Sequence, residues 1–129
     1  MLLPVVQVAN LIKSFDLPWV NKVVSSLTVP SLDGTDKTTI VLSEVQNTPT
    51  GHANDDFKAW LATVEIQIYY KKVANFNLMA AENDLTHKLT KKGWTIERSD
   101  PHVTDPESHQ ITRAFFVSNV LIEKEKSNG

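Results

Sequence analysis

The chain has 129 residues, enough for one domain with its own hydrophobic core and too few for two. It has no cysteine, which excludes disulfides and thiolate metal sites. Its 13 Lys and Arg residues stand against 15 Asp and Glu residues, for a formal charge of -2, so we expect no basic surface that would bind the phosphates of nucleic acid.

The N-terminus is apolar, but polar Gln7, Asn10 and Lys13 follow too soon for a signal peptide or a membrane span. We therefore expect a protein without a signal of its own and without a membrane partner. Pro4 suits the first turn of a helix, where its missing N–H is not needed, and Pro18 predicts the end of that helix. The apolar residues at helical spacing between the two prolines are Val5, Val8, Leu11, Ile12 and Phe15.

The segment 19–29 is compatible with two structures. The spacing of its apolar residues suits a short helix, whereas its β-branched residues suit an extended arm. We expect a short helix followed by extended chain, up to a turn at Pro30 and residues 33–34. The β-branched stretch 38–45 predicts a strand. Residues 46–56 have the composition of a loop, and its length exceeds that of most hairpin connections.

The clearest strand runs from Leu61 to Tyr70, because apolar and polar residues alternate along it as in a half-buried antiparallel strand. A helix follows that is capped by Asn75 or Asn77 and ends at Gly93. Lysines in its last turn complement the helix dipole. The predicted core face of this helix consists of Leu78, Ala81, Leu85 and Leu89.

A short strand is predicted over residues 94–98, then a polar loop over residues 99–109 and a final strand over residues 110–123. Both faces of the final strand are apolar, so we expect a helix or another subunit to cover each of them. One face carries Ile111, Phe115, Val117 and Leu121, and the other carries Ala114, Phe116, Val120 and Ile122. The charged and polar residues 124–129 predict a mobile tail.

These elements follow in the order helix, strand, strand, helix, strand, strand. The economical architecture for this order is an α+β fold, in which two helices pack on one face of an antiparallel sheet. We therefore predict a single domain with this architecture over residues 1–129.

The polar loop before the final strand holds His102 and His109 together with Asp100, Asp105 and Glu107. These side chains offer metal ligands, but neither a helical i,i+4 pair nor another compact ligand spacing is present. We therefore favour a solvated acidic loop. A metal-dependent hydrolase that uses His102, Asp105 and His109 is the alternative.

Other acidic pairs are Asp55 with Asp56 and Glu82 with Asp84. Carboxylate pairs act as general acid and base when they share a cleft. Here the first pair precedes a strand, and the members of the second pair point to different sides of a helix. With only four glycines, the chain has no phosphate-binding loop, nucleophile elbow or dinucleotide fingerprint. We therefore predict that the protein is not an enzyme and takes no cofactor or metal.

Several short motifs resemble those of a known family. They are Leu3 to Val8, the strand Val64 to Tyr70, the helix start Leu78 to Glu82, Gly93-Trp94, Asp100-Pro101-His102, Asp105-Pro106 and Gln110-Ile111-Thr112. In this order the motifs resemble the small structural proteins of siphophages of lactic-acid bacteria, which look like tail-terminator or tail-completion proteins. The resemblance covers nearly the whole chain and consists of structural motifs, not catalytic ones.

The resemblance implies a virion protein, a tail terminator that forms a ring, usually of six copies, at the head-proximal end of the tail. Such a ring is assembled in the host cytoplasm, caps the tail tube and joins it to the neck of the capsid. Its partners would be further copies of the chain, the tail tube protein and a neck or head-completion protein. DNA would pass through the ring without specific binding. A head–tail connector of the same virion is the alternative.

A closed ring needs two different patches on each copy, and neither the motifs nor the resemblance assigns them. We predict that the loop 46–56 and the final strand supply these patches. For Tyr69 we expect an interface position and a position in the core of the sheet equally, because aromatic side chains are common in both. The predicted interface residues are Asn47, Thr50, His52, Asp55, Tyr69, Phe116, Val120 and Ile122.

Overall fold

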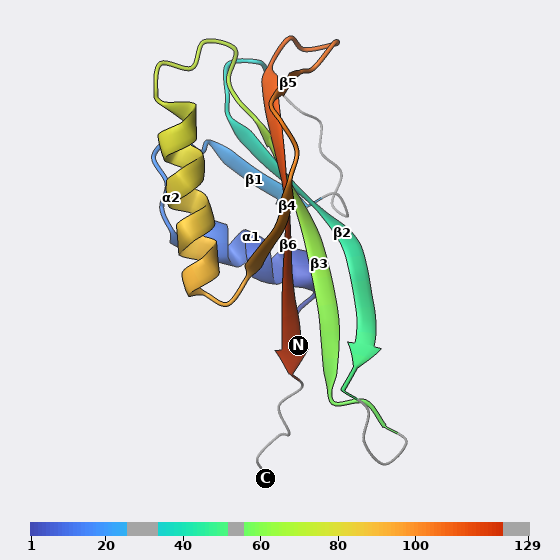
Figure 1. The fold of residues 1–129 in the computed structure, drawn as a ribbon. Coiled ribbons are helices and arrows are strands. Elements are labelled where there is room, and N and C mark those ends of the chain that lie inside the picture. The colour runs from blue at the N-terminus through green and yellow to red at the C-terminus, as the bar shows by residue number, and fades with distance from the viewer. Residues whose placement is uncertain (26–33, 52–55, 123–129) are drawn as a thin grey trace.

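The computed structural model describes residues 1–25, 34–51 and 56–122 of the chain. These residues form two helices and one six-stranded mixed sheet (Figure 1). The bounds of the elements in chain order are α1 Pro4–Ser14, β1 Lys22–Ser25, β2 Thr39–Thr50, β3 Ala59–Tyr69, α2 Leu78–Lys91, β4 Thr95–Ser99, β5 Val103–Thr104 and β6 Ile111–Ile122.

The long strands β2, β3 and β6 form the middle of the sheet, where each is antiparallel to its neighbour. The order across the sheet is β1, β2, β3, β6 and β4, and the short β5 also pairs with β6. In register, Leu42 lies opposite Ile66, and Ile66 lies opposite Phe115. An apolar row therefore crosses all three long strands on one face.

The predicted fold class is wrong, because the sheet is mixed and contains two strands, β1 and β5, that the sequence pattern does not predict. β1 pairs with β2 in parallel, with Lys22 opposite Thr39. It lies in the segment 19–29, which was expected to begin as a helix. Val23 and Val24 are β-branched and lose side-chain freedom in a helix, so extended chain along the edge of β2 is the better structure for them.

Two connections that were predicted as loops are partly strands. β2 continues to Thr50 and pairs with β3 down to Ala59, with Val45 as the extra residue of a β-bulge. Residues 46–50 have the composition of a turn, but their pairing with β3 holds them in an extended strand. β5 interrupts the polar loop before the last strand in the same way. Residues 52–55 of the hairpin connection and the predicted tail 124–129 lie outside the described residues.

The remaining predicted elements are confirmed, with their ends shifted by a few residues. They are the helix that begins at Pro4, the strand 61–70, the helix capped by Asn77 and the strands 94–98 and 110–123. Shifts of this size are ordinary, because the ends of helices and strands fray.

One hydrophobic core lies between the two helices and one face of the sheet. The stripe of α1 supplies Val5, Val8 and Ile12, and α2 supplies Leu85 and Leu89, all of which are buried. Figure 1 shows α1 crossing the sheet and α2 lying alongside it. The side chains of the sheet in this core include Ile40, Leu42, Val64, Ile66, Ile68, Phe115 and Val117. Neither described helix is long and apolar enough to cross a membrane.

The side chain of Asn77 caps the start of α2, because its Oδ1 accepts a hydrogen bond from the N–H of Ala80 at 3.0 Å. We predict that Asn77→Ala lowers the free energy of unfolding by about 1 kcal/mol, because that N–H loses its partner. Asn77→Asp keeps the acceptor and is the matched control. Urea unfolding measures both, and an alanine variant as stable as the wild type would contradict the role of the cap.

Candidate functional site

Beyond the helices the sheet narrows to the three strands β2, β3 and β6 (Figure 1). β1 pairs with β2 only along residues 39–42, and β4 pairs with β6 only along residues 115–118. The rest of the long strands continues as a three-stranded ribbon. We call its end the distal ribbon, which consists of residues 45–50, 59–62 and 119–122.

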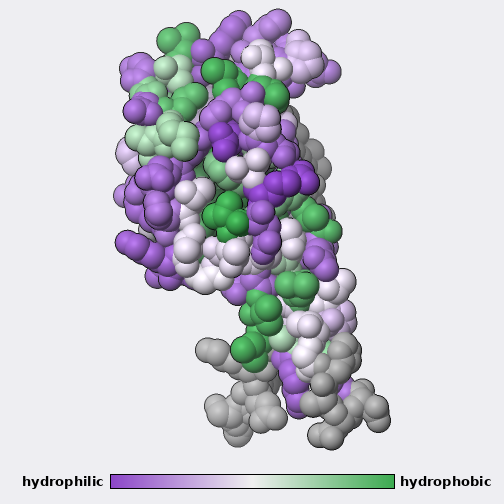
Figure 2. Space-filling model, in the orientation of Figure 1, coloured by the Kyte–Doolittle hydropathy of each residue, from purple (hydrophilic) through white to green (hydrophobic). Residues whose placement is uncertain are grey.

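On the face of the sheet that points away from the core, the distal ribbon carries exposed apolar side chains. Val120 lies opposite Leu61, and Ile122 lies opposite Ala59. Val120 is 51% exposed and Ile122 is 69% exposed. Figure 2 shows hydrophobic residues, in green, on the lower part of the molecule beside the residues drawn in grey. These neighbouring apolar side chains offer a partner a contact surface on this face.

The other face of the distal ribbon is apolar as well. Trp60 and Leu121 lie opposite each other and border a shallow pocket of about 160 Å³, together with Leu2 and Leu3. Leu2 is 57% exposed and Leu3 is 49% exposed. The ring of Phe57 stands edge-on to that of Trp60, with 5.0 Å between the ring centroids. Apolar side chains are therefore available on both faces at this one end of the molecule.

The outer edge of β2 is poorly suited to pair with another strand. Val45 forms a bulge there, and Pro49 lacks the N–H that a further strand would bind. Bulges and prolines are common means of preventing edge strands from pairing with other chains. On the β2 side, the faces of the distal ribbon are therefore better suited to contact a partner than its edge is.

Four of the predicted interface residues lie on the distal ribbon. Asn47 and Thr50 belong to β2, and Val120 and Ile122 belong to β6. Asn47 borders the pocket on the core side, whereas Val120 and Ile122 lie on the opposite face. The loop and the strand that were predicted as two separate patches thus meet at the same end of the molecule.

Tyr69 and Phe116 lie elsewhere. Tyr69 is at the opposite end of β3, where it is half-buried. Phe116 lies under the guanidinium group of Arg98, whose Cζ is 4.2 Å from the ring centroid. His52 and Asp55, the last two predicted interface residues, lie outside the described residues.

A buried polar cluster ties α2 to the sheet near the end of β3. Glu82 on α2 is 1% exposed, and its Oε2 accepts a hydrogen bond of 2.5 Å from the hydroxyl of Tyr70. The same Oε2 lies 2.7 Å from Nε2 of His102. Arg113 on β6 places Nη1 3.6 Å from Oε1 of Glu82 and 3.1 Å from Nδ1 of His102. We call these four residues the Glu82 cluster.

The Glu82 cluster is only partly satisfied by hydrogen bonds. Oε1 of Glu82 and Nε of Arg113 are buried and have no hydrogen-bond partner. The hydroxyl of Tyr70 is held in its neutral form, because burial raises the pKa of Tyr70 and its hydrogen bond to Glu82 raises it further. These two buried atoms remain available as one further acceptor and one further donor of hydrogen bonds within the cluster.

Sequence reasoning missed the Glu82 cluster, although one signal for it was present. Glu82 precedes Leu85 by three residues and Leu89 by seven, so it shares their face of the helix and is buried with them. Asp84, its partner in the sequence pattern, lies instead at the surface and forms an ion pair with Lys88 at 3.0 Å. The separation of Glu82 and Asp84 on the helix is as predicted.

The structure does not assemble the metal site considered for the loop before β6. His102 is turned toward Glu82 and Arg113. Asp105 accepts hydrogen bonds from the hydroxyl of Ser108 at 2.7 Å and from its N–H at 2.9 Å, and these bonds lower the pKa of Asp105. Among the described residues, no three His, Asp or Glu side chains are placed to hold a metal ion.

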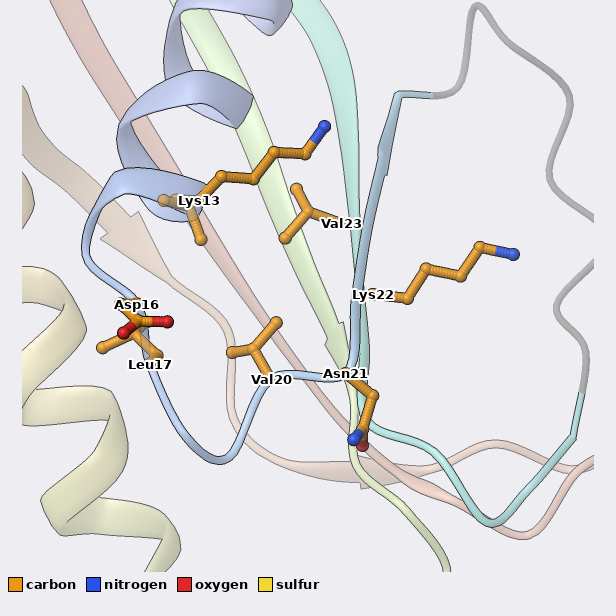
Figure 3. Close-up of a pocket in the computed structure, with 8 residues that line it drawn as sticks. Lys13, Asp16, Leu17, Val20, Asn21, Lys22 and Val23 are labelled. Atoms are coloured by element: carbon orange, nitrogen blue, oxygen red, sulfur yellow. The ribbon is translucent and has the colours of Figure 1, made fainter.

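Two further concave surfaces adjoin the connection between α1 and β1. Figure 3 shows the smaller one, a pocket of about 240 Å³, where Val20 and Val23 point toward α1 and Lys22 points away from it. The larger one is a groove of about 570 Å³ between this connection and α2, and its lining includes Trp19 and Phe76. Neither surface includes a predicted interface residue or a member of the Glu82 cluster.

The sequence profile of one protein family matches residues 2–122, which is nearly the whole chain. The family is described as "Protein of unknown function (DUF806)". The matched range includes both the distal ribbon and the Glu82 cluster. No curated protein matches the chain.

We predict that alkaline pH destabilises the protein in part through Tyr70. Because the pKa of Tyr70 is raised above its ordinary value of 10.0, its contribution to stability is complete below that pH. Above it, the unfolded chain releases the proton and the folded protein retains it. The free energy of unfolding should then fall by up to about 1.4 kcal/mol per pH unit on account of this group.

Urea unfolding at several pH values between about 9 and about 11.5 measures this slope. Tyr70→Phe removes the titrating hydroxyl and should give a shallower slope than the wild type. A wild-type slope in the Tyr70→Phe variant would contradict the prediction. Only the difference between the two slopes is assigned to Tyr70, because the other groups of the chain are the same in both proteins.

Proposed function

The chain belongs to the DUF806 family of proteins of unknown function, and we propose that it is a structural assembly subunit of a phage virion. In this proposal it is a tail terminator, whose copies form a ring at the head-proximal end of the tail. The ring caps the tail tube and joins it to the neck of the capsid. The resemblance to siphophage tail-terminator and tail-completion proteins supports this assignment.

The observation that carries the proposal is the distal ribbon. Val120 and Ile122 expose apolar side chains on one face, and Leu2 and Leu3, which precede α1, expose theirs beside the other face. Contact with water costs roughly 25 cal/mol for each Å² of apolar surface, so a partner that covers both faces is favoured. An assembly subunit would have such a surface because neighbouring subunits cover its apolar side chains in the assembly.

Ring closure also needs a second surface that differs from the first. We assign it to the groove of about 570 Å³ that includes Trp19 and Phe76. The groove lies between α2 and the connection from α1 to β1, away from the distal ribbon. The strands of the distal ribbon extend beyond the two helices (Figure 1). In the proposed ring, the distal ribbon of each copy inserts into the groove of the next.

The charge of the chain suits a ring through which DNA passes. Its formal charge of -2 offers the phosphates no net attraction, so DNA in the channel would not be held back by tight binding. The proposed partners are therefore proteins: further copies of this chain, the tail tube protein and a neck or head-completion protein. The proposed location is the virion, after assembly in the host cytoplasm.

A head–tail connector of the same virion is the alternative within this class, because it too would be a small ring-forming subunit. The two assignments differ in the partner at the tail end. A terminator binds the growing end of the tube and stops its elongation. A connector binds head and neck proteins and leaves the tube free to grow.

We predict that an excess of the purified chain stops the polymerisation of tail tube protein in vitro. A ring on the growing end would cover the surface to which the next tube subunit adds. Electron microscopy of tubes grown with and without the chain measures the effect as a shorter length. Unimpeded elongation in the presence of excess protein would reject the terminator and leave the connector to be tested against neck proteins.

Substitution on the distal ribbon tests the surface itself. We predict that Val120→Asp abolishes ring formation and capping, because the new carboxylate would have to be buried against an apolar neighbour. Val103→Asp is the matched control: Val103 is 59% exposed and lies on β5, outside the ribbon and the groove, so the same change there should leave both intact. Mass measurement and microscopy of both variants decide the matter. Equal ring formation by the two would remove the distal ribbon from the interface.

A further inference from the structure

Tyr70 connects the Glu82 cluster to the groove between α2 and the connection from α1 to β1. The side chain of Tyr70 is fully buried, and its hydroxyl donates a hydrogen bond of 2.5 Å to Oε2 of Glu82. Its ring contacts those of Trp19 and Phe76, with 6.0 Å between the ring centroids in each pair. Trp19 and Phe76 also contact each other and line the groove. The buried ring of Tyr70 thus supports two aromatic rings that the groove exposes.

Tyr70 is held at both ends of its side chain. At the backbone, its N–H donates to the carbonyl oxygen of Ile111 at 2.9 Å, and its own carbonyl oxygen accepts from Nε2 of Gln110 at 3.0 Å. At the other end, the hydroxyl is bound by Glu82. Only two torsion angles place the ring of a tyrosine. Contacts at the backbone and at the hydroxyl therefore fix the orientation of this ring.

The carboxylate that binds Tyr70 is itself held from other elements. Nε2 of His102 lies 2.7 Å from Oε2 of Glu82, and Nη1 of Arg113 on β6 lies 3.6 Å from Oε1. Glu82 is 1% exposed, so water competes little for these contacts. A side chain whose own position is fixed by packing and by neighbouring polar groups can hold its partner in one geometry. Glu82 thus presents its acceptor to Tyr70 at one place.

α2, which carries Glu82, also forms one wall of the groove. The lining residues from α2 are Ala80, Ala81, Asp84 and Lys88. Asp84 and Lys88 form an ion pair at 3.0 Å, so this pair brings no net charge to the groove and suits an apolar occupant. Glu82 is therefore linked to the wall through its helix and to the aromatic rings through Tyr70. A groove that is held in one shape binds more tightly, because less order has to be imposed on binding.

We propose that Glu82 is a positioning residue for this groove. Through Tyr70 it holds Trp19 and Phe76 in the orientation that receives apolar side chains of the next copy, such as Val120. That occupant is the distal ribbon, so this part of the inference rests on the proposed function. The orientation of the rings is a property of each single copy and does not depend on assembly.

The orientation of the rings is tested by ¹⁹F spectra of the chain labelled with fluorotryptophan. The chain has three tryptophans, and Trp19→Phe identifies the signal of Trp19 by its loss. We predict that Tyr70→Phe, which keeps the ring and removes the hydroxyl, shifts the Trp19 signal and leaves that of Trp60 on the distal ribbon in place. Tyr69→Phe makes the same change outside the Glu82 cluster and should move neither signal.

A loss of stability alone changes the fraction of folded chain and not the position of its signals. A Trp19 signal at its wild-type position in Tyr70→Phe would overturn the proposal, because packing alone would then hold the rings. Glu82→Met should shift the Trp19 signal as well, and the double variant should shift it no further, because both changes break one hydrogen bond. Tyr70→Phe leaves His102 and Arg113 beside the carboxylate, so it carries the test if Glu82→Met does not fold.

Docking is tested by the concentration at which half of the chain is in rings. Tyr70→Phe should raise it by about tenfold, as for the loss of one hydrogen bond. Ala80→Glu tests the groove itself: an acidic side chain is favoured in the first turn of α2, but here it places a charge in the lining and should prevent ring formation.

The two variants separate the two proposals. Rings of wild-type affinity in Ala80→Glu would reject the groove as the interface. Rings lost in Ala80→Glu but unchanged in Tyr70→Phe would reject the positioning role of Glu82 and leave the groove in place. A wild-type chain that forms no rings, either free or on tube ends, would contradict the proposed function, and the ¹⁹F spectra would then decide the role of Glu82 on their own.

Discussion

The length of the central strands relative to the helices governs this structure. β6 has 12 residues and spans about 40 Å, at about 3.3 Å per residue. α2 has 14 residues and spans only about 21 Å, while α1 crosses the sheet and covers a width of about 10 Å. The two helices together cannot cover the full length of one sheet face. The uncovered remainder belongs to the distal ribbon, where Leu2 and Leu3 adjoin Trp60 and Leu121. Val120 and Ile122 lie on the opposite face of the ribbon, which neither described helix covers, so their exposure follows from the placement of both helices on one side of the sheet.

The two ends of the sheet therefore have opposite chemistry. One end is a bare ribbon with apolar side chains on both faces. At the other end, a carboxylate, an arginine, a histidine and a tyrosine meet beneath α2. Buried ion pairs contribute little to net stability, because the loss of hydration offsets much of the attraction between the charges. The Glu82 cluster is accordingly easier to understand as a device that fixes one arrangement of α2 and the loops than as a source of stability.

Elements whose sequence pattern involves only neighbouring residues could be predicted, whereas elements that depend on a distant part of the chain could not. The alternation along β3 and the apolar stripes of the helices need only neighbouring residues, and both predictions are confirmed. β1, β5 and the extension of β2 depend on a partner strand that a local pattern does not reveal. The Glu82 cluster is harder still, because Tyr70 and His102 lie 12 and 20 residues from Glu82 in sequence. Val120 and Ile122 could be predicted as surface candidates because they continue the second apolar face of the last strand, and the period of a strand is a local signal.

The bulge at Val45 and the proline at position 49 have a consequence for how the chain can associate. They prevent another strand from pairing with the outer edge of β2. On this side of the molecule, a partner of the distal ribbon would therefore have to contact its apolar faces. Apolar contacts have almost no enthalpy near room temperature and weaken on cooling. Exposed charge pairs, in contrast, weaken as salt is added. Assembly through this surface would thus be sensitive to cold and largely indifferent to ionic strength, the reverse of what a charged docking surface would give.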